Sequence, residues 1–243
     1  MRRKLGLISA LVGATAVSLL SATSAGAATN LGETFDPPDF CAENTTYLVT
    51  DSVGNAYTVP FGGVISRWSF QGGSVPPDSA RLKVGRVLSG TDLSAPFTDL
   101  SVTGESASES VTANSLNTFS TRVTVQHGDF LGIFLGGDGV AHCSDGSKTG
   151  YVDHYSNSDV PAGSSAEFTR EVEGQVEVAA VLEPDADHDG FGDETQDQCA
   201  SNAGTQGQCP VAPKKKKCKK HKKKHKRSAE SAKKKKCKKK KRR

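Results

Sequence analysis

Residues 81–88 read Arg-Leu-Lys-Val-Gly-Arg-Val-Leu, and this alternation of polar and apolar residues decides the fold class. Successive side chains of a β-strand point to opposite faces, so Leu82 and Val84 share one face while Arg81 and Lys83 share the other. The run Thr-Arg-Val-Thr-Val, which begins at Thr121, has the same pattern. We therefore expect both stretches to be strands with one face in a hydrophobic core.

Similar short runs, rich in β-branched and aromatic residues, continue to Leu182 and are separated by Gly, Pro, Asn, Asp and Ser. The runs span residues 45–50, 56–60, 64–70, 81–88, 118–125, 129–135 and 175–182. No window after the N-terminal segment sustains the spacing of an amphipathic helix. Strands at such regular intervals predict an all-β fold, specifically an antiparallel, jelly-roll-like β-sandwich over residues 28–183.

The N-terminal residues 1–27 have the pattern of a secretory signal peptide. Basic residues at 2–4 precede the apolar stretch Leu5–Leu20, and Ala25-Gly26-Ala27 has the small-x-small form of a cleavage site. The apolar stretch is shorter than the roughly 20 residues that a membrane-spanning helix needs. We therefore expect cleavage before Ala28, no transmembrane segment, and a secreted or cell-surface-associated protein; an uncleaved anchor is the alternative.

Six cysteines in an exported chain indicate disulfide bonds. Cys41 and Cys143 are the only two cysteines in the predicted β region, so we expect them to pair with each other. Cys199 and Cys209 would then close a short loop after the β region.

Residues 185–193 read Asp-Ala-Asp-His-Asp-Gly-Phe-Gly-Asp, with acids at every second position before a glycine turn at Gly190. Carboxylates crowded into one turn repel each other unless a cation neutralises them, and this arrangement of oxygen ligands favours Ca²⁺. The loop is not an EF-hand, because Gln196 stands where that motif needs a bidentate Glu. The predicted ligands are the side chains of Asp185, Asp187, Asp189, Asp193 and Asp197 and the carbonyl of Phe191. The alternative is a solvated acidic linker that binds no specific ion.

This segment resembles a thrombospondin type 3 repeat, a calcium-binding repeat of secreted adhesive proteins that also occurs as a linker in bacterial envelope proteins. The matching residues are Asp185, Asp187, Asp189, Gly190, Asp193, Asp197 and Cys199. The resemblance covers about residues 185–209 and implies a calcium-binding linker over residues 184–209. The chain departs from the family pattern by one additional residue before Asp197 and by Ala200 in place of a proline.

The net charge of +4 combines two opposed blocks. Residues 28–213 carry 7 Lys/Arg and 26 Asp/Glu, a net charge of −19, whereas residues 214–243 carry 21 Lys/Arg and one acid, a net charge of +20. A segment so rich in lysine cannot bury apolar surface, so we predict a disordered tail over residues 210–243.

The predicted partners of residues 214–243 are anionic cell-wall or membrane-surface polymers. Sequence-specific nucleic-acid binding is not expected, because the tail has no aromatic residue to stack on bases. The alternative is that the tail folds back onto the acidic body of its own chain. Cys218 and Cys237 lie among the lysines, where pairing with each other is the default and crosslinking between chains is the alternative.

Residues that could support catalysis are sparse in the predicted β region. Its only histidines are His127, His142 and His154, and neither a Gly-x-Ser-x-Gly elbow nor a metalloprotease histidine pair is present. We therefore expect a non-enzymatic, envelope-associated binding or structural protein. The alternative is a carbohydrate-binding jelly roll with a glycan site on the sandwich, and an enzyme would require a pocket that gathers one of these histidines with an acid.

Overall fold

The computed structural model describes residues 27–172 and 174–211, and within them the chain is all-β, as predicted. The strands are β1 (Thr29–Glu33), β2 (Asp39–Ala42), β3 (Thr45–Asp51), β4 (Gly63–Gly72), β5 (Ser79–Val87), β6 (Phe97–Glu105), β7 (Ser115–Val125), β8 (Phe130–Gly136), β9 (Val140–Asp145), β10 (Val152–Ser156), β11 (Ser164–Val172), β12 (Gln175–Val176) and β13 (Val178–Pro184). One short 3₁₀ turn, Val53–Asn55, is the single helical element of the described part. None of it forms a helix that is long and apolar enough to cross a membrane.

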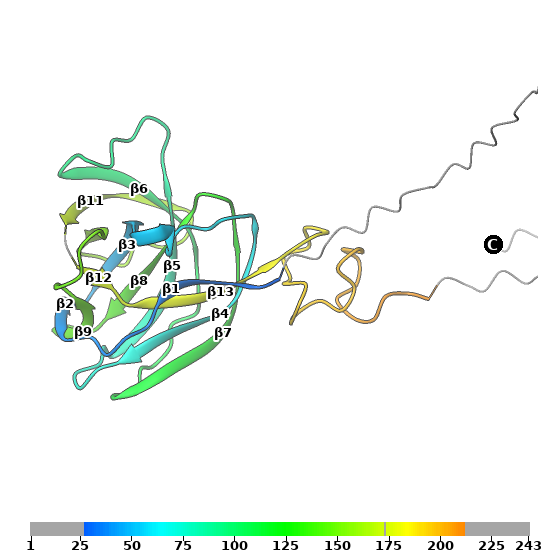
Figure 1. Cartoon of the computed structure of the whole chain (residues 1–243), viewed down its shortest axis with the longest axis horizontal. Coiled ribbons are helices and arrows are strands. Elements are labelled where there is room, and N and C mark those ends of the chain that lie inside the picture. The colour runs from blue at the N-terminus through cyan, green and yellow to red at the C-terminus, as the bar shows by residue number, and fades with distance from the viewer. Residues whose placement is uncertain (1–26, 173, 212–243) are drawn as a thin grey trace, which may run out of the picture. The chain divides into compact units, whose positions relative to one another are not determined.

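The strands form three sheets in which every pairing is antiparallel (Figure 1). Six strands close into a barrel in the order β10-β11-β6-β5-β8-β3, because β3 pairs with both β8 and β10. A four-stranded sheet has the order β1-β13-β4-β7, and a three-stranded sheet has the order β12-β9-β2. The predicted jelly-roll-like sandwich is therefore not confirmed, because the largest sheet closes on itself.

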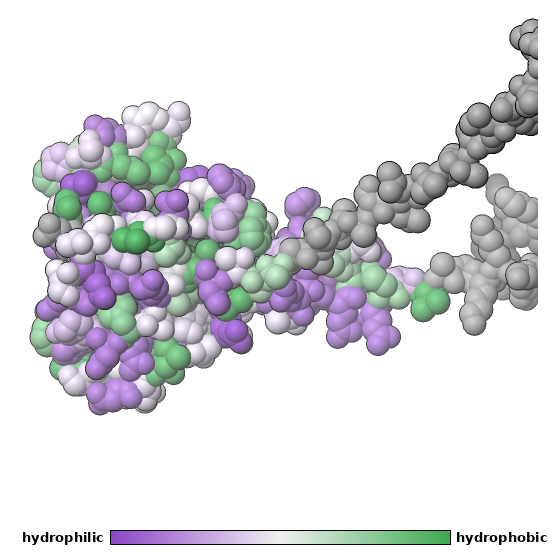
Figure 2. Space-filling model, in the orientation of Figure 1, coloured by the Kyte–Doolittle hydropathy of each residue, from purple (hydrophilic) through white to green (hydrophobic). Residues whose placement is uncertain are grey.

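The main hydrophobic core lies between the four-stranded sheet and the barrel wall. It joins Leu82 and Val84 of β5 to Ile65 and Trp68 of β4, all of them buried. A second, smaller cluster lies on the other face of the barrel strands and includes Leu48. On the face shown in Figure 2, hydrophobic residues are scattered among hydrophilic ones.

The charged face of β5 lines the interior of the barrel. Lys83 is fully buried, and its Nζ pairs with the carboxylate of Glu105 and with Asp159 Oδ1 at 2.6 Å. Nζ also donates to the carbonyl of Val160 at 3.0 Å. These three acceptors offset the cost of burying the ammonium group. The alternating pattern therefore predicted the strand and its two faces. It did not predict that the barrel encloses the face that carries Lys83.

Six of the seven predicted runs overlap strands, and the run 56–60 does not. Tyr57 and Val59 are fully buried, but the run contacts a strand only through an isolated bridge from Thr58 to Phe130. The apolar residues of the run 56–60 therefore indicate a segment of the core and not a strand.

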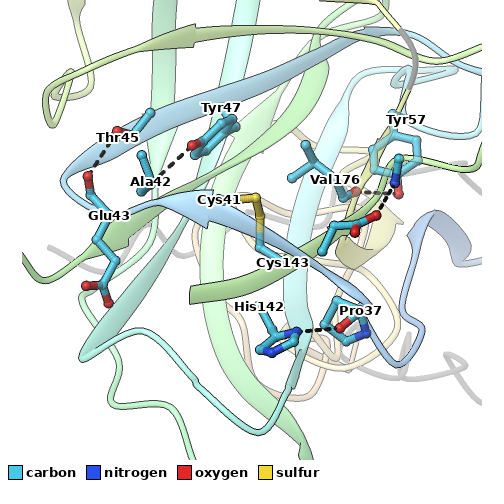
Figure 3. The surroundings of a disulfide bond; sticks show 12 residues. Pro37, Cys41, Ala42, Glu43, Thr45, Tyr47, Tyr57, His142, Cys143 and Val176 are labelled. Carbon is cyan, nitrogen blue, oxygen red and sulfur yellow. Dashed lines mark hydrogen bonds between the residues drawn. A yellow bond between two sulfur atoms is a disulfide. The ribbon is translucent and has the colours of Figure 1, made fainter. Parts of the chain in front are cut away.

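Two disulfide bonds form as predicted. Cys41–Cys143 joins β2 to β9 (Figure 3), and Cys199–Cys209 closes a loop after the last strand. Residues 1–26 of the predicted signal peptide and residues 212–243 of the predicted tail, with Cys218 and Cys237, lie outside the described residues.

Candidate metal centre

The acidic loop begins where the last strand ends. Pro184 closes β13, and its carbonyl accepts a hydrogen bond from the backbone N–H of Asp193 at 2.9 Å, which closes the loop. The chain reverses at Gly190, whose φ of +83° is readily adopted only by glycine. The sharp turn that the sequence predicted at this glycine is therefore present.

Three carboxylates converge inside this loop. Asp185, Asp187 and Asp189 each offer an oxygen atom, and the three atoms lie within 4.8 Å of one another. Oxygen ligands lie about 2.3–2.6 Å from a bound Ca²⁺, so two ligands on opposite sides of one ion are about 5 Å apart. The spacing of the three oxygens fits a single calcium ion.

Two of the predicted ligands have buried oxygen atoms without a hydrogen-bond partner among the described residues. These atoms are the two carboxylate oxygens of Asp187 and the Oδ2 atom of Asp197. A buried carboxylate oxygen without a donor is costly, so native proteins almost always pair such atoms. A cation between these groups would provide the missing interaction.

Asp193 lies close enough to the other acids of the loop for their charges to shift its pKa. Burial raises the pKa of Asp193, the N–H of Ala186 opposes that shift, and the charges of Asp185, Asp187 and Asp197 raise the pKa further. The carboxylate oxygens of Asp193 accept from Ala186 N at 3.2 and 3.3 Å. The loop thus brings four of the predicted acids into one small volume.

Asp197 reaches this group despite the additional residue before it. The N–H groups of Gln196 and Asp197 both donate to the carbonyl of Gly192 at 2.9 Å, a tight turn that absorbs the extra residue. Asp197 is 4 % exposed, and its Oδ1 accepts from the N–H of Cys199 at 2.8 Å. The second oxygen of Asp197 is therefore free to face the acidic group.

Phe191 was predicted to supply a backbone carbonyl, and the structure adds a role for its ring. The ring lies against the β-domain, 4.1 Å from the guanidinium carbon of Arg122 in β7, a cation–π contact. The N–H of Phe191 donates to Asp189 Oδ1 at 3.0 Å. Coordination by the carbonyl stays a prediction.

Sequence reasoning missed two residues that position the loop, Gln206 and Glu183. Gln206 lies inside the loop closed by Cys199–Cys209, and its Nε2 donates to Asp189 Oδ2 at 2.9 Å. No motif singled out this glutamine, because its role depends on a disulfide that brings it back to the acidic turn.

Glu183 is the main anchor between the loop and the sheet. It is fully buried and accepts hydrogen bonds from Ser66 Oγ at 2.5 Å, from Thr195 Oγ1 at 2.6 Å, and from the N–H groups of Glu194 and Thr195 at 3.0 and 2.9 Å. Burial alone would raise the pKa of Glu183, but these hydrogen bonds outweigh it and hold the pKa below its ordinary value. A Cβ atom at Gly192 would lie 2.5 Å from Glu183 Oε2, so the close approach requires glycine.

Two of the three histidines of the β region have contacts within the fold. His154 is fully buried, its Nδ1 lies 3.0 Å from Thr50 Oγ1, and burial together with the charge of Arg170 lowers its pKa to about 4. The ring of His142 lies against the ring of Phe40, with centroids 4.1 Å apart and planes tilted by 46°. His127 is exposed.

The oxygen atoms that converge in the acidic loop are of the ligand type that hard divalent cations prefer. Comparison of the chain with family models, curated proteins and solved structures found no match in any of the three.

Proposed function

We propose that this is a secreted, non-enzymatic protein of the cell envelope whose residues 185–197 bind Ca²⁺. The observation that carries the proposal is the environment of Asp187. Both of its carboxylate oxygens are buried without a hydrogen-bond partner among the described residues, beside the converging oxygens of Asp185 and Asp189. Extracellular calcium modules typically bind with dissociation constants of about 10⁻⁴–10⁻³ M, and we expect this range here.

Bound Ca²⁺ would link the acidic loop to the β-domain. The ion neutralises the repulsion between the carboxylates, and the loop is then held on the sheet by Glu183 and by the contact between Phe191 and Arg122. Gln196 adds a hydrogen bond from its Nε2 to the carbonyl of Thr121 at 2.8 Å. Calcium would thus hold the acidic loop against the β-domain.

The tail supplies the second half of the proposed function. Residues 214–243 have a net charge of +20, and a polycation of this density binds anionic cell-wall or membrane-surface polymers. The two disulfides of the described part are compatible with an extracellular location. The protein would therefore be tethered to the envelope through its tail.

Fractionation of cells that secrete the full chain tests the tether. We expect the protein in the envelope fraction at low salt and in the soluble fraction at high salt, because salt screens the attraction between opposite charges. A full-length variant with every lysine of residues 214–243 replaced by glutamine should be soluble at both salt concentrations. A variant with the same lysines replaced by arginine is the matched control and should behave as the native chain. If the native and glutamine chains partition alike, the tether is excluded.

A further inference from the structure

A second acidic site lies away from the calcium loop, in a cavity of about 490 Å³. One wall comes from the three-stranded sheet, with Asp39 and Phe40 of β2, and the other comes from barrel strands, with Tyr47 of β3, Tyr155 of β10 and Glu171 of β11. Small-molecule sites in proteins typically measure about 300–1,000 Å³. The Cys41–Cys143 disulfide joins β2 to β9 in one wall, and Tyr47 of β3 donates to the carbonyl of Ala42, at the end of β2, at 3.1 Å (Figure 3).

Asp153 is the buried polar group of this cavity. It is 4 % exposed and lines the cavity, yet no hydrogen bond from another described residue reaches its carboxylate. Its register partner across the β10–β11 pair is Glu171, which is exposed. Burial and the charge of Glu171 raise the pKa of Asp153 to about 7. A carboxylate in this position lacks a counter-charge.

The remaining lining of the cavity is suited to a cation. Asp39, Asp153 and Glu171 contribute three carboxylates, and no lysine, arginine or histidine lines the cavity. Tyr47 and Tyr155 lie with ring centroids 6.2 Å apart, and both line the cavity. Carboxylates next to aromatic rings are the combination that binds ammonium groups, through charged hydrogen bonds and cation–π contacts.

A metal ion fits this cavity less well than an organic cation. In the described part of the chain, the one group of three or more metal-ligating side chains whose atoms converge is Asp185, Asp187 and Asp189. The three acids of the cavity are not part of such a group, and they enclose a volume much larger than a single ion.

We propose that this cavity binds a primary alkylammonium group, with Asp153 as its buried counter-ion, Glu171 at the mouth and the two tyrosine rings beside the alkyl chain. The group could come from a free amine or from a lysine side chain, including the lysines of residues 214–243 of the same chain. Both sources present the same chemistry to the cavity. No lining residue of this cavity belongs to the calcium loop.

Isothermal titration calorimetry with Nα-acetyl-lysine methylamide tests the proposal on the full chain and on the full-length variant with glutamine in place of the tail lysines. We expect saturable binding to at least the glutamine variant, and no binding of the norleucine analogue, which has the same chain without the ammonium group. Binding only to the glutamine variant identifies the tail as the native occupant, whereas equal binding to both chains identifies an amine from outside. The proposal is overturned if neither chain binds the lysine probe or if the norleucine analogue binds equally well.

Two substitutions locate the binding. Asp153→Asn keeps the shape of the side chain and should weaken lysine-probe binding at least tenfold. Glu167→Gln removes one acid from the same strand as Glu171, outside the cavity lining, and should leave binding unchanged. The emission of Trp68 verifies that each variant is folded. Equal weakening by both substitutions would contradict the proposal, because it would indicate a general charge effect.

The pH dependence of binding provides a further readout. The groups that face Asp153 are Asp39, Tyr47, Tyr155 and Glu171, and Tyr47 stays neutral because burial raises its pKa to about 12. An ammonium ligand favours the ionised form of Asp153, so affinity should rise between about pH 6 and pH 8 as this group loses its proton. The Asp153→Asn variant should lack this rise, and a rise that persists in the variant contradicts the assignment.

Discussion

We expect a calorimetric titration with Ca²⁺ to give a heat of binding for the native full chain and none for the Asp187→Ala, Asp189→Ala double variant. Both side chains belong to the group whose oxygens lie within 4.8 Å of one another, and those of Asp187 have no other partner among the described residues. Protein oxygen ligands lie about 2.3–2.6 Å from a bound Ca²⁺. Without these two side chains, too few ligands remain at that distance. Ca²⁺ at a hundredfold excess over its dissociation constant stabilises the bound form by about 2.7 kcal/mol, and the variant should lose this stabilisation.

A matched control separates the loss of two metal ligands from the loss of two negative charges. Asp78 and Asp138 are exposed and lie outside the acidic loop, so the Asp78→Ala, Asp138→Ala variant changes the net charge of the protein equally. This control should titrate as the native chain does. An unchanged titration of the Asp187→Ala, Asp189→Ala variant would remove Ca²⁺ from the proposed function.

Replacing both Cys41 and Cys143 by alanine will destabilise the β-domain by about 4.7 kcal/mol, the value for a loop of about 100 residues in the chain-entropy model. The two cysteines are 102 residues apart, and the bond restricts the unfolded chain over that whole distance. Urea unfolding followed through Trp68, the only tryptophan of the chain and a core residue, measures the loss. With a typical denaturant dependence, the midpoint should fall by about 2 M.

The second disulfide provides the comparison for the first. Cys199 and Cys209 are 10 residues apart, so the same model gives about 2.8 kcal/mol for their bond. That bond also lies after the last strand, so its removal should act on the acidic loop and leave the Trp68 transition nearly unchanged. Equal lowering of the urea midpoint by the two double variants would contradict this difference between the two bonds.

The sequence predicted the class of the fold better than its topology. The alternation at Arg81–Leu88 identified β5 and its two faces, because the period of a strand depends only on local geometry. Closure of the barrel depends on the pairing of β3 with β10, whose residues lie about one hundred positions apart, and no local pattern encodes that contact. The same closure buries Lys83, a residue type that is almost never fully buried unless it is paired.

For the candidate calcium site, the sequence likewise indicated the residues that are close together in the chain but not those that are distant. Its acids could be named because a loop that binds a hard cation places oxygen ligands at fixed short intervals in one stretch of chain. Glu183 and Gln206 could not be named, because their contacts depend on the sheet edge and on the Cys199–Cys209 loop. The cavity around Asp153 was also missed, because its walls come from strands that are distant in sequence.

Hydrogen exchange of the full chain in Ca²⁺ and in excess chelator is the most direct test of calcium binding by the acidic loop. The N–H groups of Asp189 and Gly190 donate to the carboxylate of Asp185, at 3.1 and 2.9 Å, so their exchange reports on the loop itself. We expect these amides to exchange at least tenfold more slowly in Ca²⁺ than in chelator, while the amides of β8 exchange equally in both. Equal exchange of residues 185–197 under the two conditions would contradict a calcium-bound loop.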